Sequence, residues 1–343
     1  MDSYFYEEAE QGTHYVKKKA RKTLSIIACT SVISTLLSYV FYALVSVFLP
    51  YLTKIISSIL ILSGKSKIYA MAFAENFIIS EQLNHFISII ATLLCFFLPF
   101  ALVAKVLDVT EKDCAISVKG PVMKSLPFVY CASLMMASAA SLVTGGMLSF
   151  LFPDAYSRII SDTVDMYGSS TNPASLILSF VSMCVLAPIA EEFVYRGIAF
   201  GCLKRFGVSF AAVSSSLLFG LAHANPEQIS YAFVFGLVLC AVTSRTGNLK
   251  TAIIMHFINN LIGYISAYII PLISFGAADA LFNVVYNLFT GAFAIVGMVF
   301  LFKKQKNSAD TEEKKSVPIS CFFCTGTVLV IALTVTHLIS EIL

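Results

Sequence analysis

The sequence predicts an all-α protein, a polytopic bundle of about eight to nine transmembrane helices. Of its 343 residues 58% are hydrophobic and only 13% are charged, and the mean hydropathy is +0.84. Apolar runs close to the roughly 20 residues that cross a bilayer recur along the chain. This composition excludes an ordinary soluble protein of similar length.

Nine apolar runs are expected to cross the membrane. In chain order they cover 24–51, 84–107, 126–152, 174–203, 208–224, 229–244, 250–272, 281–302 and 318–340. The first run is too long for a signal-peptide core, so we expect it to remain as an anchor. Residues 54–80 are apolar but contain Gly64, Lys65, Lys67 and Glu75. We expect an interfacial or re-entrant segment there rather than a tenth span.

Basic residues predict the orientation. With nine spans and a cytoplasmic N-terminus, all but four of the 23 lysines and arginines lie on the cytoplasmic side; the four are Lys54, Lys65, Lys67 and Arg158. This distribution obeys the positive-inside rule. The net charge of +3 then belongs to a surface that faces a membrane, and it gives no reason to expect nucleic-acid binding. Nothing in the sequence indicates the oligomeric state.

Four regions follow from this map. Residues 1–23 are expected to form a cytoplasmic tail, 24–173 a transmembrane scaffold, 174–272 a catalytic or binding core, and 273–343 the last helices with a charged linker at 303–316. Loops are expected at 105–125 and 153–173. Polar side chains that could take part in catalysis or binding within apolar runs are concentrated between Pro188 and Asn260. The core is placed at 174–272 for this reason.

Glu191, Glu192 and Arg196 lie inside an apolar run, where charges are costly and therefore indicate function. Glu192 and Arg196 are i,i+4 neighbours, so we expect a structural ion pair. Glu191 points about 100° away around the helix and has no local partner. We therefore expect Glu191 to project into a cavity as the reactive group.

Two histidines are expected to join it. Gly207 is a predicted helix stop and Ser209 the next start, so a hairpin would bring Glu191 and His223, roughly 18 and 24 Å from the turn, to similar depth. Phe219 shares a face with His223, and His256 shares one with Asn260, each pair at i,i+4 spacing. Each alone is more often a packing or hydrogen-bonding residue; the combination favours a hydrolytic site. Solvation near segment ends explains His14, His85 and His337.

The residues Glu191 to Arg196 (E-E-x-x-x-R), Phe219 to His223 (F-x-x-x-H) and His256 to Asn260 (H-x-x-x-N) resemble, in order and spacing, the three motifs of the CAAX-protease and bacteriocin-processing (Abi) family. The resemblance covers 174–272. It implies an intramembrane endopeptidase that uses a water activated by Glu191 and oriented by His223. His256 and Asn260 would stabilise the oxyanion, with Glu192, Arg196 and Phe219 as structural support.

The same resemblance implies a substrate and a setting. The substrate would be a membrane-borne peptide or a lipidated protein, processed in peptide or bacteriocin maturation, self-immunity or CAAX-type C-terminal processing. The protein would lie in a bacterial plasma membrane, with the bilayer as its other partner.

Two alternatives stay open. Glu191, His223 and His256 could instead hold a zinc ion with one open position, although they come from separate helices and no H-E-x-x-H pair preorganises a metal; the preferred mechanism needs no cofactor. The chain could also be a non-catalytic membrane protein, a transporter or an immunity or scaffold protein. No inverted repeat supports a transporter. The C-x-x-C of Cys321 and Cys324 is expected to be a buried pair of ordinary thiols.

Overall fold

The computed structural model describes residues 2–107, 109, 122–166, 172–269, 277–302 and 317–342. Within these ranges every regular element is a helix and none is a strand. Five described helical stretches are long and apolar enough to cross a membrane, at 13–62, 81–106, 126–151, 173–206 and 226–246. Three shorter apolar helices lie at 208–221, 290–301 and 325–340. The prediction of an all-α polytopic bundle is confirmed. The linker 303–316 and most of the predicted loop 105–125 lie outside the described residues.

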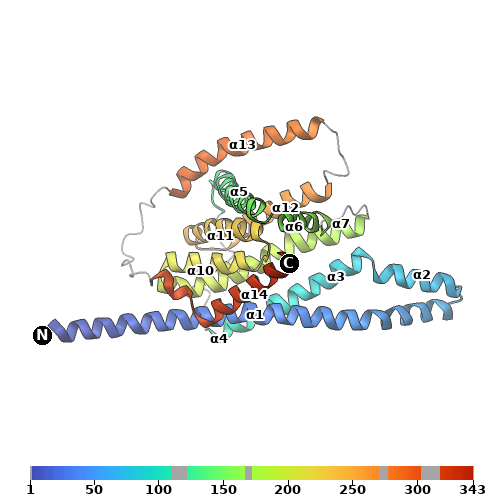
Figure 1. Ribbon diagram of the computed structural model, residues 1–343, viewed down its shortest axis with the longest axis horizontal. Coiled ribbons are helices and arrows are strands. Elements are labelled where there is room, and N and C mark those ends of the chain that lie inside the picture. The colour runs from blue at the N-terminus through green and yellow to red at the C-terminus, as the bar shows by residue number, and fades with distance from the viewer. Residues whose placement is uncertain are drawn as a thin grey trace.

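The helices form successive layers (Figure 1). α5 (Leu126–Leu151) packs between α13 (Ala277–Phe302) and α11 (Pro226–Thr246), and α11 packs in turn on α10 (Val208–Leu221). α1 (Asp2–Leu62) runs along the opposite edge of the molecule from α13, with α14 (Thr325–Ile342) beside it. The candidate motifs therefore lie in the middle layers, and α1 and α14 cover one side of them.

α1 is longer than predicted. It continues through Pro50 to Leu62, so the expected end of the first span at residue 51 is wrong. The helix stops where Gly64 adopts a φ of +88°. There Lys65 N–H donates to Leu60 O and Gly64 N–H donates to Ile61 O, the paired bonds of a Schellman cap.

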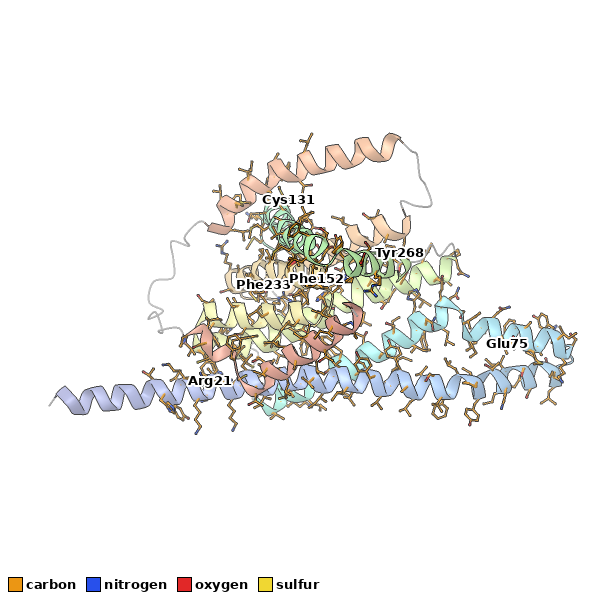
Figure 2. The ribbon with its side chains drawn as sticks, in the orientation of Figure 1. Arg21, Glu75, Cys131, Phe152, Phe233 and Tyr268 are labelled. Atoms are coloured by element: carbon orange, nitrogen blue, oxygen red, sulfur yellow. The ribbon has the colours of Figure 1, made fainter. Side chains whose placement is uncertain are left out.

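The segment after α1 turns back along it. α2 (Lys67–Ile78) packs against α1, and its 12 residues are too few to cross a bilayer. Figure 2 shows Glu75 on α2 near one end of α1 and Arg21 toward the other end of α1. The chain then returns through α3 (Glu81–Ala91), a π-helical stretch η1 (Thr92–Phe97) and α4 (Leu98–Val106).

The predicted loop at 153–173 contains a helix, α6 (Pro153–Met166), so the loop prediction is wrong for those residues. Proline in the first turn favours a helix start, and Asp154 is an acidic residue at its N-terminus. The Tyr156 hydroxyl donates to Glu227 Oε1 at 2.7 Å. That bond raises the pKa of Tyr156 and attaches α6 to α11.

The helix that carries the acidic motif is irregular. It runs through α7 (Pro173–Phe180), η2 (Val181–Leu186), α8 (Ala187–Glu191), η3 (Glu192–Phe200), α9 (Gly201–Leu203) and η4 (Lys204–Phe206), and both η2 and η3 are π-helical. The predicted stop at Gly207 is confirmed, with a φ of +122°. α10 begins at Val208, one residue before the predicted start.

The remaining elements close the bundle. α12 (Lys250–Tyr264) continues into the π-helical η5 (Ile265–Ile269). A 3-10 turn, η7 (Ile319–Phe322), precedes α14 and places Cys321 and Cys324 as buried free thiols. Gly326, at the start of α14, donates from its N–H to Ser25 Oγ on α1 at 3.0 Å. A Cβ at Gly326 would collide with the Ser25 carbonyl oxygen, so the close approach of α14 to α1 needs glycine at this position.

We therefore expect Gly326→Ala to destabilise the protein by about 1–3 kcal/mol, as overpacking does, because backbone atoms must move apart. The midpoint of thermal unfolding in detergent measures this. Gly146→Ala is the matched control: it is also a helical glycine, but no atom lies within 4 Å of a Cβ built there. Its midpoint should be unchanged or higher, since alanine is the better helix former. Equal midpoints for the two variants would contradict this account of the α1–α14 contact.

Candidate functional site

A buried carboxylate oxygen lies at the centre of the site. Glu192 and Arg196 are both fully buried, and Arg196 Nη1 donates to Glu192 Oε1 at 2.9 Å. His256 Nδ1 lies 2.8 Å from the same oxygen, and because a carboxylate accepts, Nδ1 is the donor. The i,i+4 ion pair is present, and it has a third member from α12 that its spacing does not predict.

Arg196 also connects the motif to α10. Its guanidinium carbon lies 4.3 Å from the centre of the Phe219 ring, a distance typical of a cation–π contact. Nε and Nη2 have no hydrogen-bond partner among the described residues. A Cβ added at Gly236 would lie only 2.9 Å from Nη2. The backbone of α11 therefore packs directly against the guanidinium group. The Ser215 hydroxyl on α10 donates to Tyr195 O in η3 at 2.6 Å. This bond joins the two arms of the helical hairpin.

Glu191 differs from its neighbour in being accessible. Its side chain is 26% exposed, and Oε2 lies 3.6 Å from Nε2 of His256. That separation is too long for a hydrogen bond, but it places one imidazole between the two glutamates. Glu191, which has no partner on its own helix, thus lies beside His256 of α12.

His223 lies in the turn after α10 rather than within the helix. Its Nδ1 is 2.9 Å from Phe219 O. A carbonyl oxygen only accepts, so Nδ1 carries the proton, and in the neutral ring Nε2 is left as an acceptor. The next residue, Ala224, has a φ of +56°, an uncommon and costly conformation for a residue with a Cβ.

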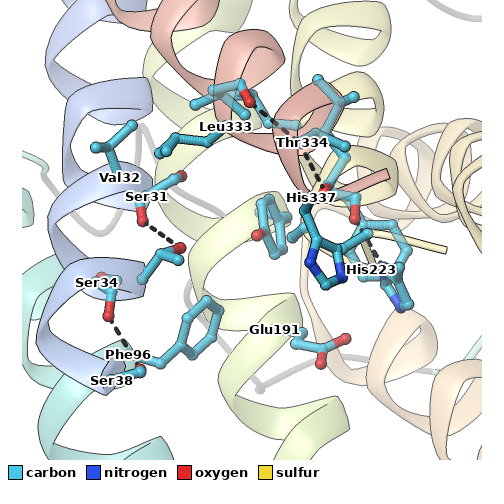
Figure 3. A pocket seen from close by; sticks show the side chains of 18 of the residues that line it. Ser31, Val32, Ser34, Ser38, Phe96, Glu191, His223, Leu333, Thr334 and His337 are labelled. Carbon is cyan, nitrogen blue, oxygen red and sulfur yellow. Dashed lines mark hydrogen bonds between the residues drawn. The ribbon is translucent and has the colours of Figure 1, made fainter. Parts of the chain in front are cut away.

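Glu191 and His223 line one cavity of about 460 Å³ (Figure 3). Its walls come from four parts of the chain, one of which is η1 with Thr92 and Phe96. The core segment contributes Glu191 and His223 together with the rings of Tyr195 and Phe219. α1 contributes a row of hydroxyl side chains; they are those of Ser31, Ser34, Thr35 and Ser38. α14 contributes one face of its helix, formed by Val330, Leu333, Thr334 and His337.

His256 and Asn260 are not among the residues that line this cavity. His256 lies behind Glu191. The Asn260 amide nitrogen donates to Met183 O at 2.8 Å, and its oxygen accepts from Asn259. The structure thus brings Glu191, Glu192, Arg196, Phe219, His223 and His256 together, and it places the Asn260 amide against η2. The expected oxyanion roles of His256 and Asn260 stay predictions.

His337 belongs to the cavity, although its sequence position near a segment end indicated only solvation. Figure 3 shows its ring on the same side of the cavity as His223 and Glu191. The signal that could have found it is the spacing of Val330, Leu333, Thr334 and His337, which share one helical face. Which helix that face meets depends on tertiary packing.

A catalytic zinc ion would need three ligand side chains close enough to bind it together. In the part of the chain that the structure describes, no group of three His, Cys, Asp or Glu side chains is placed to hold a metal ion. The Nδ1 atoms of His223 and His256 are both engaged, with Phe219 O and Glu192 Oε1. Glu191, His223 and His256 do not form a three-ligand set in this arrangement, and zinc binding stays an untested prediction.

Comparison with known proteins agrees with the motifs. Residues 173–262 match the family described as "Type II CAAX prenyl endopeptidase Rce1-like". The curated "Putative membrane peptidase YdiL" of Bacillus subtilis (strain 168) is 29% identical over 84 residues, which are 24% of this chain and 34% of that protein. The match thus spans about a third of the relative's length. No solved structure matches the chain.

The family match covers the hairpin of Glu191 and His223 and the helix of His256, the same elements whose side chains converge in the structure. Residues 173–262 are therefore similar to the type II CAAX prenyl endopeptidase Rce1-like family, and this similarity covers about a quarter of the chain.

Proposed function

We propose that this protein is an intramembrane endopeptidase that hydrolyses a peptide bond of a membrane-borne or lipidated peptide with a water activated by Glu191. The observation that carries the proposal is the shared cavity of Glu191 and His223. A carboxylate and an imidazole acceptor facing one cavity suit general-base activation of a water. The cavity volume of about 460 Å³ is in the range of small-ligand sites.

The geometry supports different roles for Glu191, His223 and His256. The Nε2 acceptor of His223 holds the water, and Glu191 removes its proton as the oxygen attacks the peptide carbonyl. His256 is anchored through Nδ1 on Glu192, which keeps its Nε2 beside Glu191. When the intermediate collapses, the carbon–nitrogen bond breaks and the proton passes from Glu191 to the leaving amine.

The hydroxyl row on α1 supports a peptide as substrate, since hydroxyl groups bond readily to backbone amides. The biological setting belongs to the proposal as well. Maturation of a peptide or bacteriocin, self-immunity, or CAAX-type processing at a C-terminus would each supply a membrane-borne peptide. The N-terminus is proposed to be cytoplasmic, in a bacterial plasma membrane.

Glu191→Gln should abolish cleavage without disturbing the fold, because the amide cannot take a proton from water while its size is unchanged. Purified wild type and variant in liposomes are incubated with lipidated and unlipidated peptide libraries, and products are identified by mass spectrometry. Thermal unfolding checks that the variant is folded. If the wild type cuts nothing that Glu191→Gln fails to cut, the enzyme proposal is lost and a non-catalytic role takes its place.

Glu192→Gln should act first on folding. The substitution leaves the buried Arg196 guanidinium without a counter-charge, and removing one partner of a buried pair costs about 3–5 kcal/mol. We expect a lower yield and unfolding midpoint, with cleavage by the folded fraction weakened but still above that of Glu191→Gln. A stable, inactive Glu192→Gln beside an unstable, active Glu191→Gln would reverse the assigned roles.

Cleavage should persist after rigorous chelation, because the mechanism is built from carboxylate and imidazole groups alone. The check pairs the rate after dialysis against a strong chelator with elemental analysis of the same sample. Loss of activity that returns with stoichiometric zinc would overturn direct activation by Glu191.

A further inference from the structure

The hydroxyl row of α1 lies outside the segment that matches the family, which begins at residue 173. Figure 3 shows Ser31, Ser34 and Ser38 following one another along α1, across the cavity from Glu191. Thr35 belongs to the same row. Among the other described lining residues, hydroxyl groups come singly from η1, η3 and α14, as Thr92, Tyr195 and Thr334. Successive hydroxyl groups on one helical face are therefore a property of the α1 wall.

Ser31 and Ser34 lack the hydrogen bond that their neighbours make. Serine and threonine inside a helix can donate to a carbonyl one turn earlier, and the hydroxyl groups of Thr35 and Ser38 do so, to Ser31 O at 3.1 Å and to Ser34 O at 3.0 Å. The hydroxyl oxygens of Ser31 and Ser34 are buried without a partner among the described residues, and Ser34 is only 4% exposed. An unpaired buried hydroxyl is costly. Both residues line the cavity, so a bound molecule can supply the partner.

A peptide that is to be cut has groups that need such partners. In a helix each backbone N–H donates to the carbonyl four residues earlier, and the surrounding turns shield the carbonyl carbon from an attacking water. The segment around the bond to be cut must therefore be unwound. Its N–H and C=O groups then lose their partners, and inside a membrane each unpaired group is costly. A wall of hydroxyl groups can replace the lost bonds.

The row matches an extended peptide in length and in bonding capacity. From Ser31 to Ser38 the helix rises about 10.5 Å, at about 1.5 Å per residue, and three residues of an extended chain cover about 10 Å. The hydroxyl protons of Ser31 and Ser34 are not used within the described residues, so they can be donated to carbonyl groups. Thr35 donates its proton to Ser31 O but keeps a lone pair that can accept from an N–H. The wall thus offers both donors and an acceptor.

We propose that the hydroxyl row of α1 binds the backbone of the substrate, and this rests on the proposed hydrolysis. Ser31 and Ser34 donate to carbonyl groups, and Thr35 accepts from an N–H, of a peptide segment that is held extended beside Glu191. These are positioning residues, since they take no part in the breaking of the bond. Because the row contacts backbone groups, it selects an unwound segment rather than a particular series of side chains.

Ser34→Ala should raise KM for a library peptide that the wild type cleaves, by about 2- to 12-fold, the effect of one net hydrogen bond. The value of kcat should change little, because the bond is present both before and during the reaction. The unfolding midpoint should be unchanged or higher, because the substitution removes a buried hydroxyl that has no partner in the described chain. Weaker binding without lost stability distinguishes a substrate contact from a structural one.

Thr35→Val removes the hydroxyl with little change of shape and should also raise KM. Thr53→Val is the matched control. Thr53 lies on α1 and its hydroxyl donates to Leu49 O at 3.0 Å, as that of Thr35 does to Ser31 O, but Thr53 is not among the residues that line the cavity. Its KM and kcat should equal those of the wild type.

Peptides in which one amide is replaced by an ester test the contact itself, because an ester has no N–H. At the position bound by Thr35 the ester should raise KM in the wild type but have little further effect in Thr35→Val, so the two losses are not additive. If every ester peptide loses as much with Thr35→Val as with the wild type, the backbone contact is overturned.

The outcomes separate the two proposals. Unchanged KM in both Ser34→Ala and Thr35→Val, while cleavage still depends on Glu191, overturns the α1 site and leaves the endopeptidase intact. A raised KM together with a lower unfolding midpoint in Ser34→Ala shows a structural residue and also overturns the site. Absence of any cleavage that depends on Glu191 is the failure of the proposed function itself, and the α1 site is then lost with it.

Discussion

The arrangement of the site depends on one buried carboxylate oxygen, Oε1 of Glu192. It accepts from Arg196 within its own helix and from His256 on α12, so two helices are held at one depth in the bundle. A charge in such a place is stable only when paired and hydrogen-bonded. Arg196 extends the connection to Phe219 on α10. Glu192 therefore positions the elements that carry both histidines, while it has no surface in the cavity.

The π-helical stretch η3 begins at Glu192, the residue where the two carboxylates part. π-helical turns are rare and frequently lie at functional sites. Glu191 ends the preceding α-helical turn with a partly accessible side chain, and Glu192 opens the wider turn with a side chain that is fully buried. The backbone thus separates a carboxylate that faces the cavity from its neighbour, which is buried in the core.

Local relations in the site could be predicted from sequence, and relations between distant helices could not. The Glu192–Arg196 pair, the stop at Gly207 and the hairpin of α10 follow from spacing and turn chemistry. The contact of His256 with Glu192 spans 64 residues and depends on how α12 is rotated, which spacing does not determine. The place of His337 at the cavity could not be predicted either, because it depends on how α14 is rotated in the bundle. α6 was missed because its polar residues resemble those of a loop, and the end of α1 because Pro50 does not interrupt the helix.

The contact between Ser25 and Gly326 joins residues 301 positions apart, and it closes the side of the cavity formed by α1 and α14. This separation has a consequence for biosynthesis. A ribosome adding about 5–20 residues per second exposes α14 only some 15–60 seconds after α1. Glu191 and His223 join the chain before α14 does, so the wall that α14 forms is missing during the last part of that interval. Until α14 is made, the side of the cavity beside Glu191 and His223 therefore lacks one of its walls. Packing of α14 against α1 is the step that completes the cavity.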